Sequence, residues 1–150
     1  GETADEPLEK ARQYPAVIVM LRALAPVVIL ALAGCQDEKP AGPQVMVPSG
    51  RELSLIDVIT NAPGPEGAAA RFRFLAPGLE AEDAEAANAD MQVVCDSFAL
   101  ERTDGMVPEP QQIIISFMGA PVPFGEPAPD VVQFFESFRA ENGACVREVY

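Results

Sequence analysis

The stretch AAARFRFL, residues 68–75, alternates between apolar and basic side chains. In an extended chain Phe72 and Phe74 point to one side, and Arg71 and Arg73 point to the other. This period of two predicts a half-buried strand that packs its phenylalanines inward and turns its arginines away from the core. A sheet built from such strands needs a helix or a second sheet over its apolar face.

Helical periodicity follows this strand. Between Asp83 and about Leu100, apolar residues recur three or four positions apart, which indicates one buried face. Acidic residues gather at the N-terminal end, where the helix dipole favours negative charge. The segment predicts one amphipathic helix with Cys95 on its inner face. The apolar positions are Ala87, Met91, Val94, Cys95 and Phe98.

Two further strands are predicted, one before and one after this region. Residues 51–59 alternate enough to suggest a strand that runs into a short turn of helix. Residues 111–118 contain three consecutive isoleucines, which favour a central strand. Residues 131–139 fit either a helix or a strand.

A hairpin is predicted near the C-terminal end of the sequence. The pair Asn142-Gly143 stands between apolar stretches and is a strong signal for a two-residue turn. Residues 136–141 and 144–150 are therefore expected to pair as antiparallel strands.

A separate apolar stretch lies at residues 16–34 and has Arg22 as its single charge. A short basic start leads into an apolar core at 23–31, which is short for the roughly 20 residues of a membrane-spanning helix but typical of a signal peptide. The tetrad Leu32-Ala33-Gly34-Cys35 then resembles the lipobox of bacterial lipoproteins. The alternative is an ordinary buried cysteine in a membrane-spanning helix.

The lipobox resemblance implies that the Cys35 thiol receives a diacylglycerol, that the chain is cut before it, and that the new amino group is acylated. Gln36 follows the cysteine. In Gram-negative lipoproteins a residue other than aspartate at that place implies the outer membrane. The resemblance therefore implies an outer-membrane lipoprotein that faces the periplasm, with the inner membrane as the alternative.

The chain divides into four parts on these grounds. Residues 1–19 are acidic where a signal peptide should begin with basic residues, so we interpret them as non-native translation upstream of a start at Met20, or as a fragment of a longer open reading frame. Residues 20–34 are the predicted signal peptide. Residues 35–50 contain three prolines and few large apolar groups, which predicts a tether. Residues 51–150 form one predicted domain.

Once Cys35 is assigned to the lipid, Cys95 and Cys145 are left as an even pair. In an exported protein such a pair is most simply a disulfide. The alternative is a free reactive pair, which the lack of Cys-x-x-Cys spacing and of a neighbouring imidazole disfavours. The predicted fold is α+β, with one amphipathic helix on a small antiparallel sheet in the chain order β-β-α-β-β-β. The disulfide would staple the helix to the last strand.

Composition excludes several functions. The 150 residues carry 23 acids, 10 bases and no histidine, for a formal charge of −13. Without histidine there are no His-based triads and no Cys/His zinc sites. The negative charge opposes binding to nucleic acid, because phosphate backbones are bound by lysine and arginine. No cofactor is predicted.

Most of residues 45–150 resemble a family of small exported Gram-negative proteins with no established function. The resemblance rests on short motifs along the predicted domain. These are Ala62-Pro63-Gly64-Pro65, Arg71-Phe72-Arg73-Phe74, Pro123-Phe124-Gly125, Gln133-Phe134-Phe135-Glu136 and Gly143-Ala144-Cys145.

Three side chains are candidates for contact with an anion or a partner. Arg71 and Arg73 are two apart on a strand and project to one side, where they can hold a carboxylate or phosphate. The interpretation we favour is a solvent face with both arginines paired to acids. Phe124, in a proline-rich loop, either faces a partner or tucks into the core, and we favour the core.

Catalytic and metal-binding residues are not predicted. Asp57, Asp96 and Glu136 are candidates for a carboxylate pair in a hydrolase of envelope polymers, but their spacing singles out no two of them. The acids at 80–90 lack the spacing of a calcium loop. The function we expect is an interaction or structural module of the cell envelope, held to the membrane by its lipid, with an envelope protein or polymer as its partner.

Overall fold

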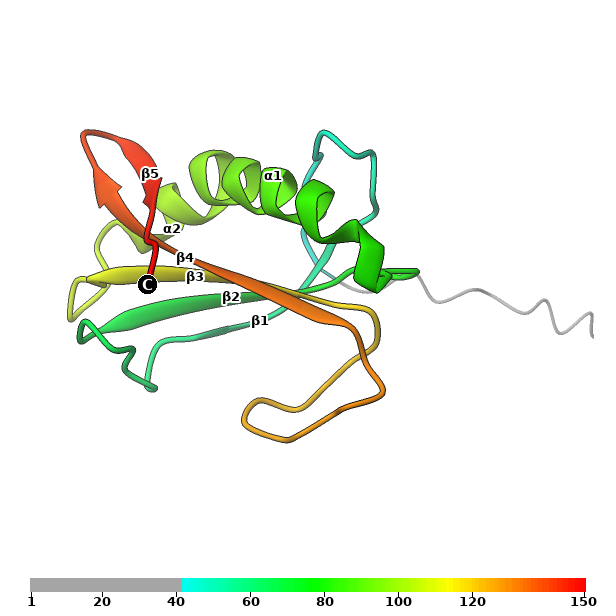
Figure 1. Cartoon of the computed structure of the whole chain (residues 1–150). Coiled ribbons are helices and arrows are strands. Elements are labelled where there is room, and N and C mark those ends of the chain that lie inside the picture. Colours follow the sequence, from blue (N-terminus) through cyan, green and yellow to red (C-terminus); the bar gives the residue numbers. More distant parts are fainter. Residues whose placement is uncertain (1–41) are drawn as a thin grey trace, which may run out of the picture. The chain divides into compact units, whose positions relative to one another are not determined.

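A computed structural model describes residues 42–150, in which five strands form one sheet and helical segments cross one of its faces (Figure 1). The strands lie side by side in the order β1-β2-β3-β4-β5. This arrangement confirms the α+β class and the packing of a helix on a sheet. The strands are β1 (Ser54–Ile59), β2 (Ala69–Leu75), β3 (Gln112–Met118), β4 (Gln133–Glu141) and β5 (Ala144–Arg147).

The sheet is mixed, so the prediction of a purely antiparallel sheet is wrong. β2 and β3 run parallel, with Ala70 opposite Ile113 and Phe74 opposite Phe117, whereas the other three strand pairs are antiparallel. The helical region causes this difference. It carries the chain from the end of β2 back along the sheet, so that β3 starts beside the start of β2.

The helical region is divided into four consecutive segments, where the sequence predicted a single helix at 83–100. A 3₁₀ turn (Ala81–Asp83) precedes α1 (Ala84–Val94), and a π-helical turn (Cys95–Ala99) leads into α2 (Leu100–Thr103). The predicted chain order β-β-α-β-β-β therefore has one helical element at the place where the structure has four. The wider π turn helps to hold Cys95, Phe98 and Ala99 all within the core.

The structure defines β1, which the sequence predicted at 51–59, and β4, in a region that fitted either a helix or a strand. The first begins at Ser54 and contains an irregularity between Leu55 and Asp57. No helical turn follows it, so that part of the prediction is wrong. Residues 133–141 form β4, which settles the choice between helix and strand for most of 131–139.

The predicted hairpin joins β4 to β5. Asn142 and Gly143 have φ angles of 52° and 77°, the left-handed conformation that a tight two-residue turn requires. The pairing of Glu141 with Ala144 follows directly. β5 ends at Arg147, earlier than the predicted residue 150.

The core lies between the sheet and the helical region. Phe98 meets Phe72 and Phe74 edge to face, with ring centroids 6.3 Å and 5.7 Å apart. The phenylalanines of β2 are therefore buried as the alternating pattern predicted. Fully buried core side chains include Leu53, Phe72, Phe74, Met91, Ile113, Ile115, Phe117 and Phe138.

A disulfide joins Cys95 to Cys145, with the two Cα atoms 6.1 Å apart. The predicted pairing is confirmed, and the bridge ties the helical region to β5. Asp96 strengthens the same junction, because its Oδ1 accepts a hydrogen bond of 2.8 Å from the backbone N–H of Cys145.

The segment 42–50, part of the predicted tether, packs on the domain. Val45 and Val47 contact the core. Ser49 donates hydrogen bonds from its backbone N–H and its hydroxyl to the two carboxylate oxygens of the fully buried Asp90 on α1. The segment that packs as part of the domain therefore starts before residue 51.

The predicted signal peptide, Cys35 and residues 35–41 of the tether lie outside the described residues. Within residues 42–150, none of the helices is long and apolar enough to cross a bilayer.

Candidate binding site

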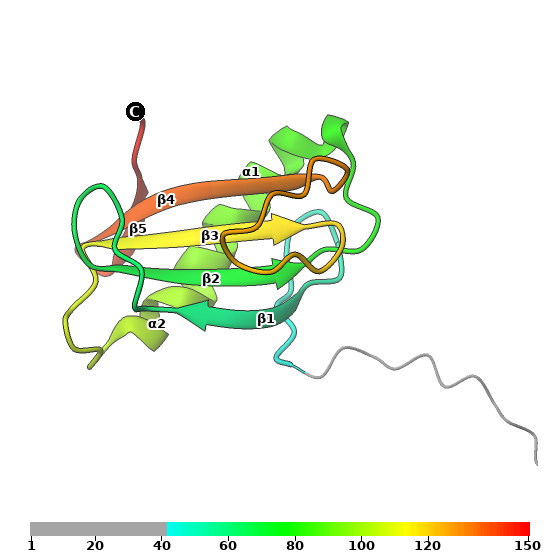
Figure 2. The same ribbon diagram turned by 90° about the horizontal axis from the view of Figure 1, so that it is seen from below.

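The helix covers one face of the sheet, and a loop at residues 119–132 lies over the other face (Figure 2). Between this loop and the strands is a cavity of about 500 Å³. This volume falls within the roughly 300–1,000 Å³ of pockets that hold small molecules. We call it the sheet pocket, and its walls include Arg71, Arg73, Ile114, Met118, Phe124 and Phe135.

The loop forms the roof of the sheet pocket. Its ends are joined by a hydrogen bond of 2.9 Å from the Gly119 N–H to the Val132 carbonyl. Gly125, at a φ of 81°, turns the chain just after Phe124. Val122 is buried against the sheet, so the roof is attached along its first half as well as at its ends.

Arg73 ties the roof to the floor. Its side chain is buried and forms an ion pair of 2.9 Å with Asp57 on the neighbouring strand β1. It also donates a hydrogen bond to the carbonyl oxygen of Val122 in the loop. The pairing with an acid agrees with the favoured interpretation of this residue, but its burial does not, because the loop shields it from solvent.

Arg71 is bound differently. Its guanidinium donates to the carbonyl oxygens of Ala62 and Pro63, at 3.3 Å for Pro63, in the loop before β2. Among the arginines at 42–150, Arg71 is the one with no carboxylate oxygen within 4.0 Å. Its carbonyl partners are neutral, so they do not balance its positive charge. The expected pairing of Arg71 with an acid is therefore wrong.

Phe124 lies beside both arginines. The guanidinium carbons of Arg71 and Arg73 are 5.5 Å and 5.6 Å from the centre of its ring, which is the range of cation–π contacts. The ring is half-exposed at 48%. The favoured interpretation of Phe124 as a core residue is therefore wrong, because the arginines hold the ring at the roof of the sheet pocket.

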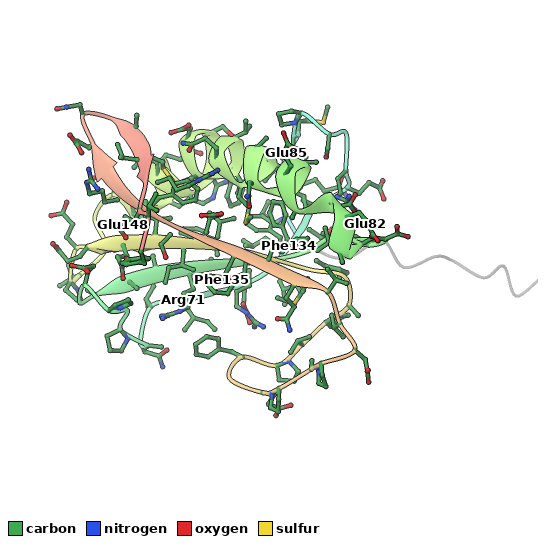
Figure 3. All side chains as sticks on the ribbon, viewed as in Figure 1. Arg71, Glu82, Glu85, Phe134, Phe135 and Glu148 are labelled. Atoms are coloured by element: carbon green, nitrogen blue, oxygen red, sulfur yellow. A yellow bond between two sulfur atoms is a disulfide. The ribbon has the colours of Figure 1, made fainter. Side chains whose placement is uncertain are left out.

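The floor of the sheet pocket changes character across the strands. Arg71 on β2 is level with Ile114 on β3, which is level with Ser137 on β4. In the next row of the floor, Phe135 is 72% exposed. It points to the same side of the sheet as Arg71, whereas Phe134 points to the helix side (Figure 3). Away from the arginines, the floor therefore combines the apolar side chains of Ile114 and Phe135 with the small hydroxyl side chains of Ser116 and Ser137.

The chain after β5 borders the same cavity. Gln112 donates from its side-chain amide to Glu148, at 2.7 Å, and to the phenol oxygen of Tyr150. Tyr150 in turn donates to Glu148 at 2.7 Å. The hydrogen bond to Glu148 raises the pKa of the Tyr150 phenol, because loss of its proton would place two negative charges together.

The carboxylates considered for catalysis lie apart. Asp57 pairs with Arg73, and Glu136 lies 3.6 Å from Arg147. Glu136 is opposite the buried Ile115, so strand alternation places it on the helix side, away from Asp57. Asp96 caps the start of β5. The structure therefore brings no two of these candidates together as a reacting pair.

The acids near α1 have structural partners. The Glu80 N–H donates to Asp83 at 2.9 Å, and Arg51 pairs with Asp83 at 2.6 Å. The backbone hydrogen bond and, after it, the arginine lower the pKa of Asp83. Residues 42–150 contain no group of three or more acids or cysteines arranged to hold a metal ion.

The sequence named Arg71, Arg73 and Phe124 but did not predict the sheet pocket that they share. The sequence did not identify Ile114, Met118 and Phe135 as residues of a cavity, because apolar residues in a strand are ordinarily expected in the core. Four of the short motifs quoted above contribute to the cavity walls. These four motifs come together only because the loop folds over the sheet, and the spacing of residues in the sequence does not predict how the loop folds.

A sequence profile described as a family of unknown function (DUF6497) matches residues 24–150. The chain belongs to this family. The expected resemblance to a small family without an established function agrees with this result. Neither the curated proteins nor the solved structures include a significant match.

Proposed function

We propose that this protein is a lipid-anchored module of the cell envelope that binds a ligand in the sheet pocket. The observation that carries the proposal is the arrangement of Phe124 beside Arg71 and Arg73 over an open floor. Arginine and aromatic side chains are enriched where proteins bind partners. A loop that closes one face of a sheet over a cavity is a typical setting for such a site.

The disulfide supports an envelope location. Disulfides persist in secreted and periplasmic proteins and are rare in the reducing cytosol. The Cys95–Cys145 bridge links two segments 50 residues apart, so it is part of the architecture of the domain. Together with the lipobox at residues 32–35, it favours export followed by acylation of Cys35.

The residues of the sheet pocket are suited to binding a ligand. Ser116 and Ser137 lie in its walls, but the sequence contains no histidine to act as their base. The two lysines, Lys10 and Lys39, lie outside the described residues. The groups that remain in the cavity can hold a ligand by charge, hydrogen bonds and apolar contact.

A photo-crosslinking residue in living cells tests ligand binding. Placed at Phe135, on the exposed floor, it should add mass to the protein after illumination. The matched control is Glu85, which is exposed on the helix side. Binding at the sheet pocket predicts an adduct at 135 and none at 85, and equal labelling at both positions would contradict it.

Labelling cells with a radioactive fatty acid tests the anchor. The unaltered protein should incorporate the label and fractionate with the outer membrane. Cys35→Ala should lose both properties. Absence of label in the unaltered protein, or label that survives Cys35→Ala, would refute lipid anchoring.

A further inference from the structure

We infer that the sheet pocket takes a small apolar monocarboxylic acid, with its carboxylate on Arg71 and its apolar body across β3 and β4. This inference rests on the binding function proposed above and adds the chemical class of the ligand. It joins three features: a charge without a carboxylate partner, an apolar floor beside it, and an acidic rim.

The charge of Arg71 selects the head group. The protein carries more than twice as many acids as bases, yet Arg71 has no carboxylate within 4.0 Å among the described residues. Its two carbonyl partners use Nη1 and Nη2 and fix the plane of the guanidinium. A guanidinium has five N–H donors and binds carboxylates well, so an incoming carboxylate can pair with this held cation.

Arg73 is less suited to the head group, although it is only two residues away. Asp57 already pairs with it at 2.9 Å, and Val122 accepts another of its hydrogen bonds. Its task is to hold the roof loop. The two arginines therefore divide the work, Arg73 positioning the loop and Arg71 facing the ligand.

The floor selects the body of the ligand. From Arg71 on β2 the floor continues over Ile114 on β3 to β4, where the exposed Phe135 lies two residues before Ser137, the partner of Ile114. Neighbouring strands are about 4.8 Å apart, so this path is roughly 10 Å long. An alkyl chain needs no hydrogen-bond partners along such a path, and each methylene that leaves water for the apolar floor strengthens binding.

The rim limits the charge of the ligand. Glu126 and Glu148 line the sheet pocket together with the two arginines. A second negative charge on the ligand would lie close to these carboxylates. Like charges repel at close range, so this repulsion would weaken binding. A single carboxylate on an apolar body avoids this cost, whereas a phosphate or a polyanion does not.

A second cavity of the domain lacks these features. It has about 560 Å³ and lies between the end of the helical region and the β4–β5 hairpin. Its walls contain Asp104 and Glu109 and no basic side chain. The two cavities are therefore similar in volume, and the sheet pocket differs from the other in containing Arg71, an arginine without a carboxylate partner among the described residues.

Three probes with the same eight-carbon chain test the inference: octanoate, octanol and octylammonium. The full chain is used with Cys35→Ser, so that no attached acyl group competes. Calorimetric titration should give the tightest binding for octanoate, at least tenfold tighter than for octanol, and none for octylammonium. Equal binding of octanoate and octanol, or no binding of octanoate, would overturn the inference.

Variants then locate the head group. Arg71→Gln should weaken octanoate binding at least tenfold, and Arg71→Lys should restore part of it. Arg139→Gln is the matched control, because Arg139 is exposed and pairs with Glu141 outside the sheet pocket. It should change affinity less than twofold. If Arg71→Gln and Arg139→Gln behave alike, the assignment of Arg71 is wrong.

The two proposals fail separately. A crosslinked adduct at position 135 without any octanoate binding would keep the binding function and reject this ligand class. Octanoate binding that depends on Arg71, with no adduct at 135 in cells, would keep the ligand class and reject the proposed function in the envelope.

Discussion

The two faces of the sheet are covered in contrasting ways. On the helix side, aromatic and aliphatic side chains fill the space, and the Cys95–Cys145 disulfide fastens the cover to β5. On the loop side, Arg73 and Phe124 connect the cover to the floor by charge, hydrogen bonding and cation–π contact, and about 500 Å³ remains open. One face is packed without an opening of this kind, and the other leaves a cavity open to solvent.

Removal of the disulfide should have the largest effect and should fall on the helix side. With Cys95→Ser and Cys145→Ser together, the free energy of unfolding should drop by about 4 kcal/mol, because a 50-residue loop regains its entropy in the unfolded chain. Urea denaturation of the oxidised protein and the double variant measures this. A loss below about 1 kcal/mol would mean that apolar packing alone holds the helix.

Arg73→Met should have the largest effect on the loop side. It removes the ion pair to Asp57 and the tie to Val122 and leaves a partly buried carboxylate unpaired, which should cost about 3 kcal/mol. Arg139→Met, at an exposed ion pair, should cost less than about 1 kcal/mol. Similar losses for the two variants would contradict the role given to Arg73.

Asp90→Ala tests the buried acid on the helix side. Both of its oxygens accept hydrogen bonds from Ser49, and bonds to a charged group contribute about 2 kcal/mol. Asp90→Ala should therefore lower the free energy of unfolding by about 2 kcal/mol and make proteolysis at residues 43–49 faster. Ser49→Ala should reproduce part of both effects. Unchanged proteolysis would show that the segment stays on the domain without Asp90.

Phe124→Ala should destabilise the protein by only about 1 kcal/mol, since a half-exposed ring over two cations contributes little more than its cation–π contacts. Phe124→Ala should reduce the free energy of octanoate binding by more than it reduces the free energy of unfolding. A loss near that of Arg73→Met would instead identify Phe124 as part of the core.

The smallest effect concerns Tyr150. Glu148→Gln should lower the pKa of the phenol toward its ordinary value, as measured by ultraviolet titration in a Tyr14→Phe background that leaves one tyrosine. Because the pKa is raised in the folded state, the contact stabilises the fold below the ordinary phenol pKa and is lost as pH rises through the folded value. An unchanged titration curve would show that Glu148 does not contact the phenol in solution.

Local patterns in the sequence predicted much of the fold. Alternation at Arg71–Phe74 correctly assigned the inner face of β2, and Asn142-Gly143 located the hairpin. The parallel pairing of β2 with β3 was not predicted, although a continuous apolar run such as the three isoleucines of β3 is more typical of parallel strands than of antiparallel ones. Pairing direction depends on where the helix returns the chain, which is a property of the whole domain.

The candidate site was predictable only in part. The arginines were visible as a pair, but their different partners depend on Asp57 and on the loop carbonyls at Ala62 and Pro63. Asp90 read as one of several acids at the start of a helix. Its burial against Ser49, 41 residues away, is a tertiary contact that leaves no local pattern.

The clamp between Ser49 and Asp90 has a mechanical consequence. A pull on the chain from its N-terminal side enters the domain through residues 43–49, and the hydrogen bonds to Asp90 pass the load to α1. The disulfide in the adjoining π-helical turn then transfers it to β5, across the full width of the sheet. Pro43 and Gln44 are also attached to β1, by the hydrogen bond of 3.4 Å from the Leu55 N–H to the Pro43 carbonyl and by the bridge between Gln44 and Ser54, so the load divides between the sheet and the helical region.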